Sequence, residues 1–132
     1  KLADGRRLMK KLGITEIADN DINEVSGGQL QRACICRSMI NSPQMIFADE
    51  PTGALNRAAS DEVMGELTKL NAEGTTVMLV THDVKVAAKC TRVLYIVDGN
   101  IKGEYTLGEY DDAAGMRGRE RVLTGWLMEM GW

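Results

Sequence analysis

Three short apolar runs constrain the fold of this chain more than any other feature. They occupy residues 45–48, 77–80 and 93–97, and none of them alternates polar with apolar side chains. Continuous runs of this length between helical segments are typical of parallel strands that are buried on both faces. We therefore predict an α/β fold with a mostly parallel, buried sheet.

The segments between and after these runs predict the connections of that sheet. Residues 57–70 carry apolar side chains on one helical face, which predicts the crossover helix between the first two strands. A shorter helix, from residue 83 to about 89, leads to the third run. Asp98-Gly99 predicts a tight turn into an antiparallel strand at residues 101–105. The tail, residues 112–130, predicts a terminal helix with an apolar stripe made by Val122, Leu123, Trp126, Leu127 and Met130.

The N-terminal part predicts a helical segment that precedes the sheet. Apolar residues recur at helical spacing from Leu2 to Leu12, and Gly13 is a typical helix stop. Residues 14–25 read as a polar connection. Ser26 and Gln29 have the spacing of a capping box, which predicts a second helix that ends before Pro43.

Composition excludes several functional classes. The 132 residues amount to one domain, and 44% of them are apolar. No run approaches the ~18 apolar residues of a membrane span. The net charge of −3 argues against a basic surface for nucleic acid.

The cysteines do not form a metal-binding or disulfide pattern. Cys34, Cys36 and Cys90 are an odd number, and the first two point to different faces of a helix. We expect them to be small buried apolar residues in a reducing cytoplasm.

Ser26, Gly27, Gly28 and Gln29 are candidates for binding an anion. They lie where a helix begins, so unpaired backbone N–H groups and the positive end of the helix dipole can hold a phosphate. Glycines let the phosphate come close to the backbone. The alternative is a glycine turn with an ordinary N-cap.

Asp49, Glu50 and His82 follow two of the predicted strands. Parallel strands bring their carboxyl ends to one edge of a sheet, where ligands bind in open α/β folds. Two adjacent carboxylates beside an apolar core need a cation or hydrogen bonds to offset the cost of burial. His82 is the only histidine, and the alternative is a purely structural role for it.

Three short motifs contain these candidates, at residues 25–29, 45–52 and 81–83. In this order they resemble the second half of the nucleotide-binding subunit of an ATP-binding-cassette (ABC) transporter, which has a P-loop NTPase cassette fold. The resemblance implies that Ser26, Gly27, Gly28 and Gln29 are the signature sequence, which binds the γ-phosphate of a nucleotide held by the opposing subunit. It implies that Asp49 holds Mg²⁺, that Glu50 orients or deprotonates the attacking water, and that His82 contacts the γ-phosphate. Asn56 falls in the D-loop, where the family usually has aspartate, and Val25 stands where leucine is usual.

The resemblance also implies a function. The subunit would bind and hydrolyse ATP with Mg²⁺, dimerise with a second nucleotide-binding subunit around two ATP molecules, and drive an integral membrane permease from the cytoplasmic face of the membrane. Residues 48–56, 86–88 and 126–132 look like the bacterial cassettes of antimicrobial-peptide export, of the bacitracin or lantibiotic type.

The phosphate-binding loop of such a subunit, Gly-x-x-x-x-Gly-Lys-Ser/Thr, does not occur in the sequence, which also starts without methionine. We therefore expect a C-terminal piece of one ATPase domain. Its parts are a signature segment at about residues 1–43, a sheet core at about 44–110 and a terminal helix at about 111–132. Alone, this piece is expected to be inactive and to self-associate. The alternatives are an ABC ATPase that does not serve transport, or a truncated interaction module without enzymatic activity.

Overall fold

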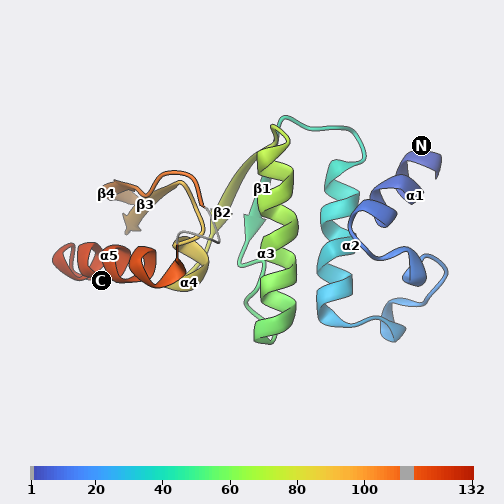
Figure 1. The fold of residues 1–132 in the computed structure, drawn as a ribbon, viewed down its shortest axis with the longest axis horizontal. Coiled ribbons are helices and arrows are strands. Elements are labelled where there is room, and N and C mark those ends of the chain that lie inside the picture. The colour runs from blue at the N-terminus through green and yellow to red at the C-terminus, as the bar shows by residue number, and fades with distance from the viewer. Residues whose placement is uncertain (1, 111–114) are drawn as a thin grey trace. The chain divides into compact units, whose positions relative to one another are not determined.

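The computed structural model describes residues 2–110 and 115–132, which form two compact units, Lys1–Val80 and Thr81–Trp132. Each unit is described by itself. In chain order (Figure 1) the elements are α1 (Leu2–Lys11), the short 3-10 helices η1 (Thr15–Ile17) and η2 (Ile22–Glu24), α2 (Gly27–Met39), β1 (Met45–Asp49), α3 (Arg57–Ala72), β2 (Thr76–Val80), α4 (Val84–Ala87), β3 (Arg92–Val97), β4 (Asn100–Thr106) and α5 (Met116–Glu129).

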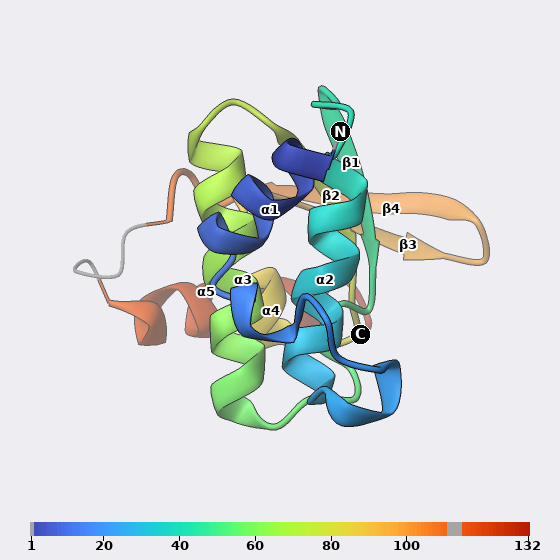
Figure 2. The same ribbon diagram turned by 90° about the vertical axis from the view of Figure 1, so that its right-hand side faces the viewer.

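The predicted helices of the first unit are confirmed. α1 ends just before Gly13, whose φ of +65° suits glycine. α2 starts after Ser26 and ends before Pro43, as the capping box and the proline predict. α1 packs on α2, and α2 packs on α3 (Figure 2), so these helices form one layer.

The connection between α1 and α2 is more ordered than its polar sequence predicts. It contains η1 and η2, and the side chains of Ile14 and Ile17 are buried in it. Asp21 caps η2 through a capping box with Glu24. The two isoleucines anchor the connection to the apolar interior because burying such a side chain is favourable by ~1.5–3 kcal/mol.

The parallel β–α–β unit is also confirmed. β1 pairs in parallel with β2, from Met45 opposite Thr76 to Asp49 opposite Val80. α3 is the crossover between them and buries Val63, Met64, Leu67 and Leu70. Because the register runs to the last residue of each strand, the two carboxyl ends are level.

Two finer expectations about the sheet are not met. The third apolar run forms β3, which among the described strands pairs only with β4 and is antiparallel to it. The parallel pair is also not buried on both faces, because Ile46 is buried whereas Phe47 is 76% exposed. A run of apolar residues is buried on both faces only where a layer covers each face, and α3 packs on one.

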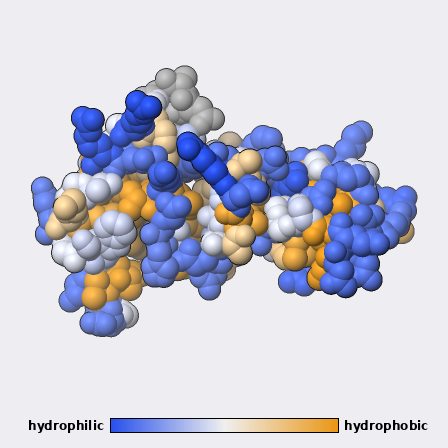
Figure 3. All heavy atoms as spheres, turned by 90° about the horizontal axis from the view of Figure 1, so that it is seen from below, coloured by the Kyte–Doolittle hydropathy of each residue, from blue (hydrophilic) through white to orange (hydrophobic). Residues whose placement is uncertain are grey.

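The uncovered face of the β1–β2 pair is apolar. It carries Met45, Phe47, Met78 and Val80, and each of these side chains is between 43% and 76% exposed. Apolar side chains also reach the surface elsewhere, and the face seen in Figure 3 mixes hydrophobic and hydrophilic residues. We call the four residues of the parallel pair the open sheet face.

In the second unit, β3 and β4 form the hairpin that Asp98-Gly99 predicts. Both turn residues have positive φ, +50° and +75°, as a tight two-residue hairpin turn requires. Gly103 on β4 faces α5, where an added Cβ would lie 2.8 Å from Cζ2 of Trp126. Trp126 packs on Tyr95 and Tyr105, with ring centroids 6.5 and 5.4 Å away, so α5 is seated on the hairpin.

The terminal helix is confirmed with one correction. Leu123 and Leu127 are buried with Ala88 in the core of this unit, whereas Val122 is 48% exposed and lies off the buried stripe. Adjacent residues on a helix differ by ~100° in direction, so one narrow interface cannot bury both Val122 and Leu123. The predicted start at residue 112 lies outside the described residues.

The cysteines differ in burial, as the spacing of the first pair predicts, but not all are buried as expected. Cys34 is exposed on α2, whereas Cys36 is buried. Burial raises the pKa of the Cys36 thiol. Burial also raises the pKa of the Cys90 thiol, and the positive charge of Arg119 partly offsets that rise.

Among the helices in the described ranges, none is both long enough and apolar enough to cross a membrane.

We expect this chain, when pure, to self-associate through the open sheet face, because a second copy can remove these apolar side chains from water. Changing Phe47 to Asn should shift sedimentation toward the monomer. Ile101→Asn is the matched control, since Ile101 is 63% exposed on β4 in the other unit. A parent chain that is monomeric at every concentration, or an equal effect of both variants, would contradict the prediction.

Candidate functional site

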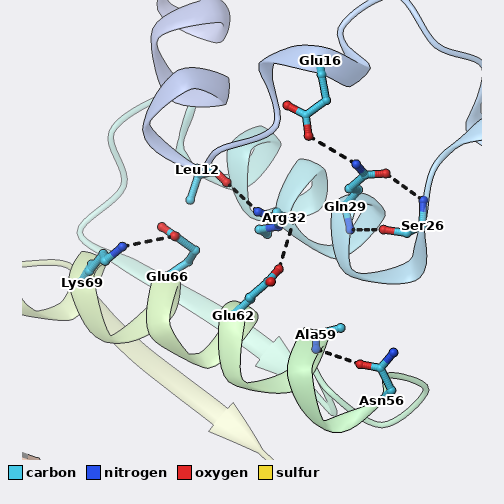
Figure 4. Close-up of polar contacts among 10 residues, drawn as sticks. All are labelled: Leu12, Glu16, Ser26, Gln29, Arg32, Asn56, Ala59, Glu62, Glu66 and Lys69. Atoms are coloured by element: carbon cyan, nitrogen blue, oxygen red, sulfur yellow. Dashed lines mark hydrogen bonds and ion pairs between the residues drawn. The ribbon is translucent and has the colours of Figure 1, made fainter. Parts of the chain in front are cut away.

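Ser26 and Gln29 form the capping box that starts α2. The Oγ atom of Ser26 accepts a hydrogen bond from the backbone N–H of Gln29 at 3.1 Å, and the Ser26 N–H donates to Oε1 of Gln29 at 2.9 Å (Figure 4). The N-cap alternative of the sequence is therefore observed. The capping box still leaves Ser26 able to bind a ligand, since its hydroxyl keeps its own hydrogen to donate.

The first turn of α2 suits an anion. Ser26 and Gly27 are exposed. The first N–H groups of any helix have no acceptor within it, and the helix dipole adds partial positive charge there. A phosphate oxygen at this turn could accept from the Ser26 hydroxyl and from the glycine N–H groups.

Glu16 is a contact that the sequence does not reveal. The Nε2 atom of Gln29 donates to Oε1 of Glu16 at 3.3 Å, across 13 positions in the chain. This bond and the capping box together fix the orientation of the Gln29 amide. No local pattern links η1 to the start of α2, so sequence reasoning had no signal for the pair.

The two glycines of the signature segment also serve packing. A Cβ atom on Gly27 would lie 3.0 Å from Cδ2 of Leu55, and one on Gly28 would lie 3.1 Å from Cβ of Ala59. Ala59 lies in the first turn of α3, and Leu55 lies two residues before that helix. A side chain at Gly28 would press on the Cβ of Ala59, whereas the Leu55 side chain beside Gly27 can move aside, so Gly28 has a packing role even without a ligand.

Asn56 is the N-cap of α3. Its side chain accepts a hydrogen bond from the Ala59 N–H at 2.9 Å (Figure 4). Sequence reasoning placed Asn56 in the D-loop and missed this cap, although asparagine directly before a predicted helix is a typical N-cap signal. Asparagine and aspartate cap equally well, so α3 starts normally without the carboxylate.

Arg32 joins three helices of the first unit. Its Nη1 donates to the carbonyl oxygen of Leu12 at 3.3 Å, and its Nη2 lies 3.4 Å from Oε2 of Glu62 (Figure 4). The side chain is only 16% exposed. Removing it would leave a buried carbonyl without this donor and loosen α2 against its neighbours.

Asp49 and Glu50 lie at the carboxyl end of β1, as predicted. Asp49 is the last residue of the strand and is exposed. The Glu50 N–H donates to the Val80 carbonyl at 2.8 Å, and the Glu50 carbonyl accepts from Gly53 at 3.1 Å. The backbone of Glu50 is left-handed, with φ +45°, and its Oε1 atom is buried.

This backbone conformation costs free energy that local packing must supply. A left-handed residue with a side chain costs of order 1–3 kcal/mol, and such strain concentrates at functional sites. Here it re-aims the chain directly after β1. The neighbouring carboxyl groups of Asp49 and Glu50 also differ in exposure. One is open to solvent and the other is half-buried.

His82 lies two residues beyond the end of β2 and is exposed. Its neighbours are well fixed. The Asp83 N–H donates to Thr81 Oγ1 at 3.0 Å, and the Asp83 carboxylate accepts from the backbone N–H of Lys85 at 2.8 Å. The carboxylates belong to the first unit and His82 to the second. That His82 lies close to Glu50 stays a prediction.

The carboxylates fit magnesium better than a metal held by protein alone. Within the described ranges, no three histidine, cysteine or acidic side chains gather into a group that could hold a metal ion. Mg²⁺ is commonly bound by one or two carboxylates, with water and phosphate oxygens as the other ligands. The exposed Asp49 carboxylate suits that arrangement.

Comparisons with known proteins agree with the sequence motifs. Residues 2–53 match the family model described as ABC transporter. The chain is 46% identical over 106 residues to a macrolide export ATP-binding/permease protein, MacB 1/2 of Paracoccus denitrificans, covering 80% of this chain and 16% of that protein. It is 44% identical over 105 residues to the bacitracin export ATP-binding protein BceA of Halalkalibacterium halodurans, covering 79% of this chain and 42% of BceA.

The structural comparison leads to the same family. The dimeric structure of MJ0796, a bacterial ABC transporter cassette, matches with a TM-score of 0.70 and 38% identity, covering 82% of this chain and 47% of the cassette. The predicted resemblance of this chain to the ATP-binding cassettes of ABC transporters is confirmed. The chain spans less than half the length of these relatives.

The packing role of the signature glycine predicts a stability effect in this cassette segment. Gly28→Val should lower stability by about 1–3 kcal/mol, because its side chain would overlap Ala59. Gly65→Ala is the control: Gly65 lies in α3 with open space at its Cβ, and alanine should add about 0.5–1 kcal/mol. Thermal unfolding followed by circular dichroism measures both, and a Gly28→Val chain as stable as the parent would refute the packing role.

Proposed function

We propose that this chain is part of the ATP-binding and ATP-hydrolysing subunit of an export-type ABC transporter. The observation that carries the proposal is the strained Glu50, with one buried carboxylate oxygen, beside the exposed Asp49 at the level ends of β1 and β2. A structural acidic turn needs neither the strain nor the difference in exposure between the two carboxyl groups.

The two carboxylates take different parts in the reaction. Asp49 faces solvent and holds Mg²⁺, directly or through water. Bound Mg²⁺ supplies positive charge that neutralises charge developing on the phosphates. Glu50 accepts a proton from the attacking water or orients it, and its fixed backbone limits the positions that its carboxylate can take.

The remaining candidates act on the γ-phosphate. Ser26, Gly27, Gly28 and Gln29 offer a hydroxyl, an amide and the N–H groups of a helix start, and they bind the nucleotide held by a second subunit. His82 contacts the γ-phosphate from the nucleotide's own subunit. Asn56 lies where two such subunits meet, with hydrogen-bonding capacity but no charge.

This reading implies two partners. A second ATP-binding subunit completes two sites around two ATP molecules, and a membrane permease couples hydrolysis to export. The subunit then acts at the cytoplasmic face of the membrane without crossing it. The named relatives export macrolides and bacitracin, which supports antimicrobial compounds as the cargo class.

In a full-length subunit that carries this sequence, Glu50→Gln should abolish ATP hydrolysis while nucleotide binding persists. Glutamine keeps the shape of the side chain but cannot accept a proton from water. Steady-state phosphate release should fall by about 10²–10⁴-fold, the usual contribution of a general base.

Binding of a fluorescent ATP analogue to the same variant shows whether the site is intact. Glu73→Gln is the control, since Glu73 is exposed and pairs only at the surface with Lys11. Hydrolysis by Glu50→Gln at the parental rate would remove Glu50 from the mechanism, and loss of hydrolysis in Glu73→Gln would show that the assay reports general damage.

The 132-residue chain by itself should neither bind ATP tightly nor hydrolyse it, because the sequence offers no phosphate-binding loop with its lysine. Phosphate release and equilibrium binding of ATP with Mg²⁺ measure this. ATP turnover by the unsubstituted 132-residue chain that disappears in its Glu50→Gln variant would contradict the prediction.

A further inference from the structure

Backbone carbonyl groups surround the guanidinium of Arg119. All five N–H hydrogens of its guanidinium have a carbonyl acceptor: Nε donates to Ala88 at 2.7 Å, Nη1 to Leu107 at 3.2 Å and Glu109 at 3.1 Å, and Nη2 to Cys90 at 2.9 Å and Gly108 at 3.0 Å. The charged group also lies 5.5 Å from the ring centroid of Tyr110. These contacts lie within the second unit.

The acceptors belong to two segments that are far apart in sequence. Ala88 and Cys90 end the α4 turn, and residues 107–109 follow β4. The last carbonyls of a helix have no intrahelical donor and carry partial negative charge, so a cation there is favourable. Arg119, in the first turns of α5, therefore fixes the end of α4 to the hairpin and to the terminal helix.

A very short element separates these acceptors from His82. α4 has only four residues, and the Asp83 carboxylate caps its start by accepting from Lys85. Asp83 is held in turn by its N–H bond to Thr81 Oγ1. At the other end of the helix Ala88 is fully buried.

We propose that Arg119 is a positioning residue that sets the place of His82 through α4. The inference rests on the proposed function, in which His82 contacts the γ-phosphate. Arg119 touches neither substrate nor cofactor in this scheme. Its five-way fork explains why an arginine, and not any apolar residue of similar length, lies on the partly buried side of α5.

Two variants separate charge from geometry. Arg119→Gln removes the charge and most donors, whereas Arg119→Lys keeps the charge but has three donors and no planar fork. Arg121→Gln is the matched control, because Arg121 is exposed on the same helix. Trp126→Leu is the stability control, because it loosens α5 on Tyr95 and Tyr105 but leaves every hydrogen-bond donor of Arg119 in the chain.

The first measurement uses the 132-residue chain, in which His82 is the only histidine. Its imidazole NMR signal should shift in Arg119→Gln, shift less in Arg119→Lys, and stay in place in Arg121→Gln. Amide hydrogen exchange at residues 84–90 should become faster in Arg119→Gln, less so in Arg119→Lys, and should be unchanged in Arg121→Gln. An unchanged His82 signal with unchanged exchange in Arg119→Gln would overturn the inference.

The second measurement uses a full-length subunit that carries this sequence. Arg119→Gln should lower kcat for ATP hydrolysis by about tenfold with KM changed less than about twofold, because a misplaced γ-phosphate contact affects the transition state more than binding. Trp126→Leu should lower thermal stability but leave kcat near the parental value. If Arg119→Gln hydrolyses ATP normally while Glu50→Gln does not, the positioning role is wrong and the proposed function stands. A parent subunit without ATPase activity would refute the proposed function itself.

Discussion

The close approach of the first turns of α2 and α3 is the contact on which the first unit depends. Gly28 leaves room for Ala59, with 3.1 Å between their Cβ positions. The start of α2 carries Ser26 to Gln29, the residues proposed to bind phosphate, and the start of α3 follows Asp49 and Glu50 in the chain. The packing of Gly28 therefore brings the first turns of the two helices together, and Arg32 of α2 contacts Glu62 of α3 and the Leu12 carbonyl just after α1.

Several candidate site residues have structural bonds of their own. Ser26 and Asn56 each cap the start of a helix through a side-chain oxygen, and so does Asp83, the neighbour of the candidate His82. Loss of an N-cap costs typically ~1 kcal/mol, so substitutions at these positions act on folding as well as on any ligand. Glu50 differs, because its φ of +45° is a cost to the fold rather than a contribution.

The second unit is held by one aromatic and one ionic anchor on the terminal helix. Trp126 fits over Gly103 between two tyrosines, and Arg119 donates to five carbonyls near the end of α4 and after β4. The aromatic anchor seats α5 on the hairpin. The ionic anchor reaches the short segment that follows β2 and carries His82, so the C-terminal helix is coupled to a candidate site residue.

The sequence alone determined the local features. The helix starts and stops, the parallel unit and the Asp98-Gly99 hairpin follow from spacing, caps and turns, because these signals act over a few residues. The roles of the candidate site residues came from the resemblance to ABC cassettes. Tertiary structure decided the exposure of Phe47 and Val122, the pairing of β3 with β4, and the Glu16–Gln29 and Arg119 contacts. Those depend on which layers cover a face and which distant carbonyls lack a donor, and such long-range partners leave no periodic trace in the chain.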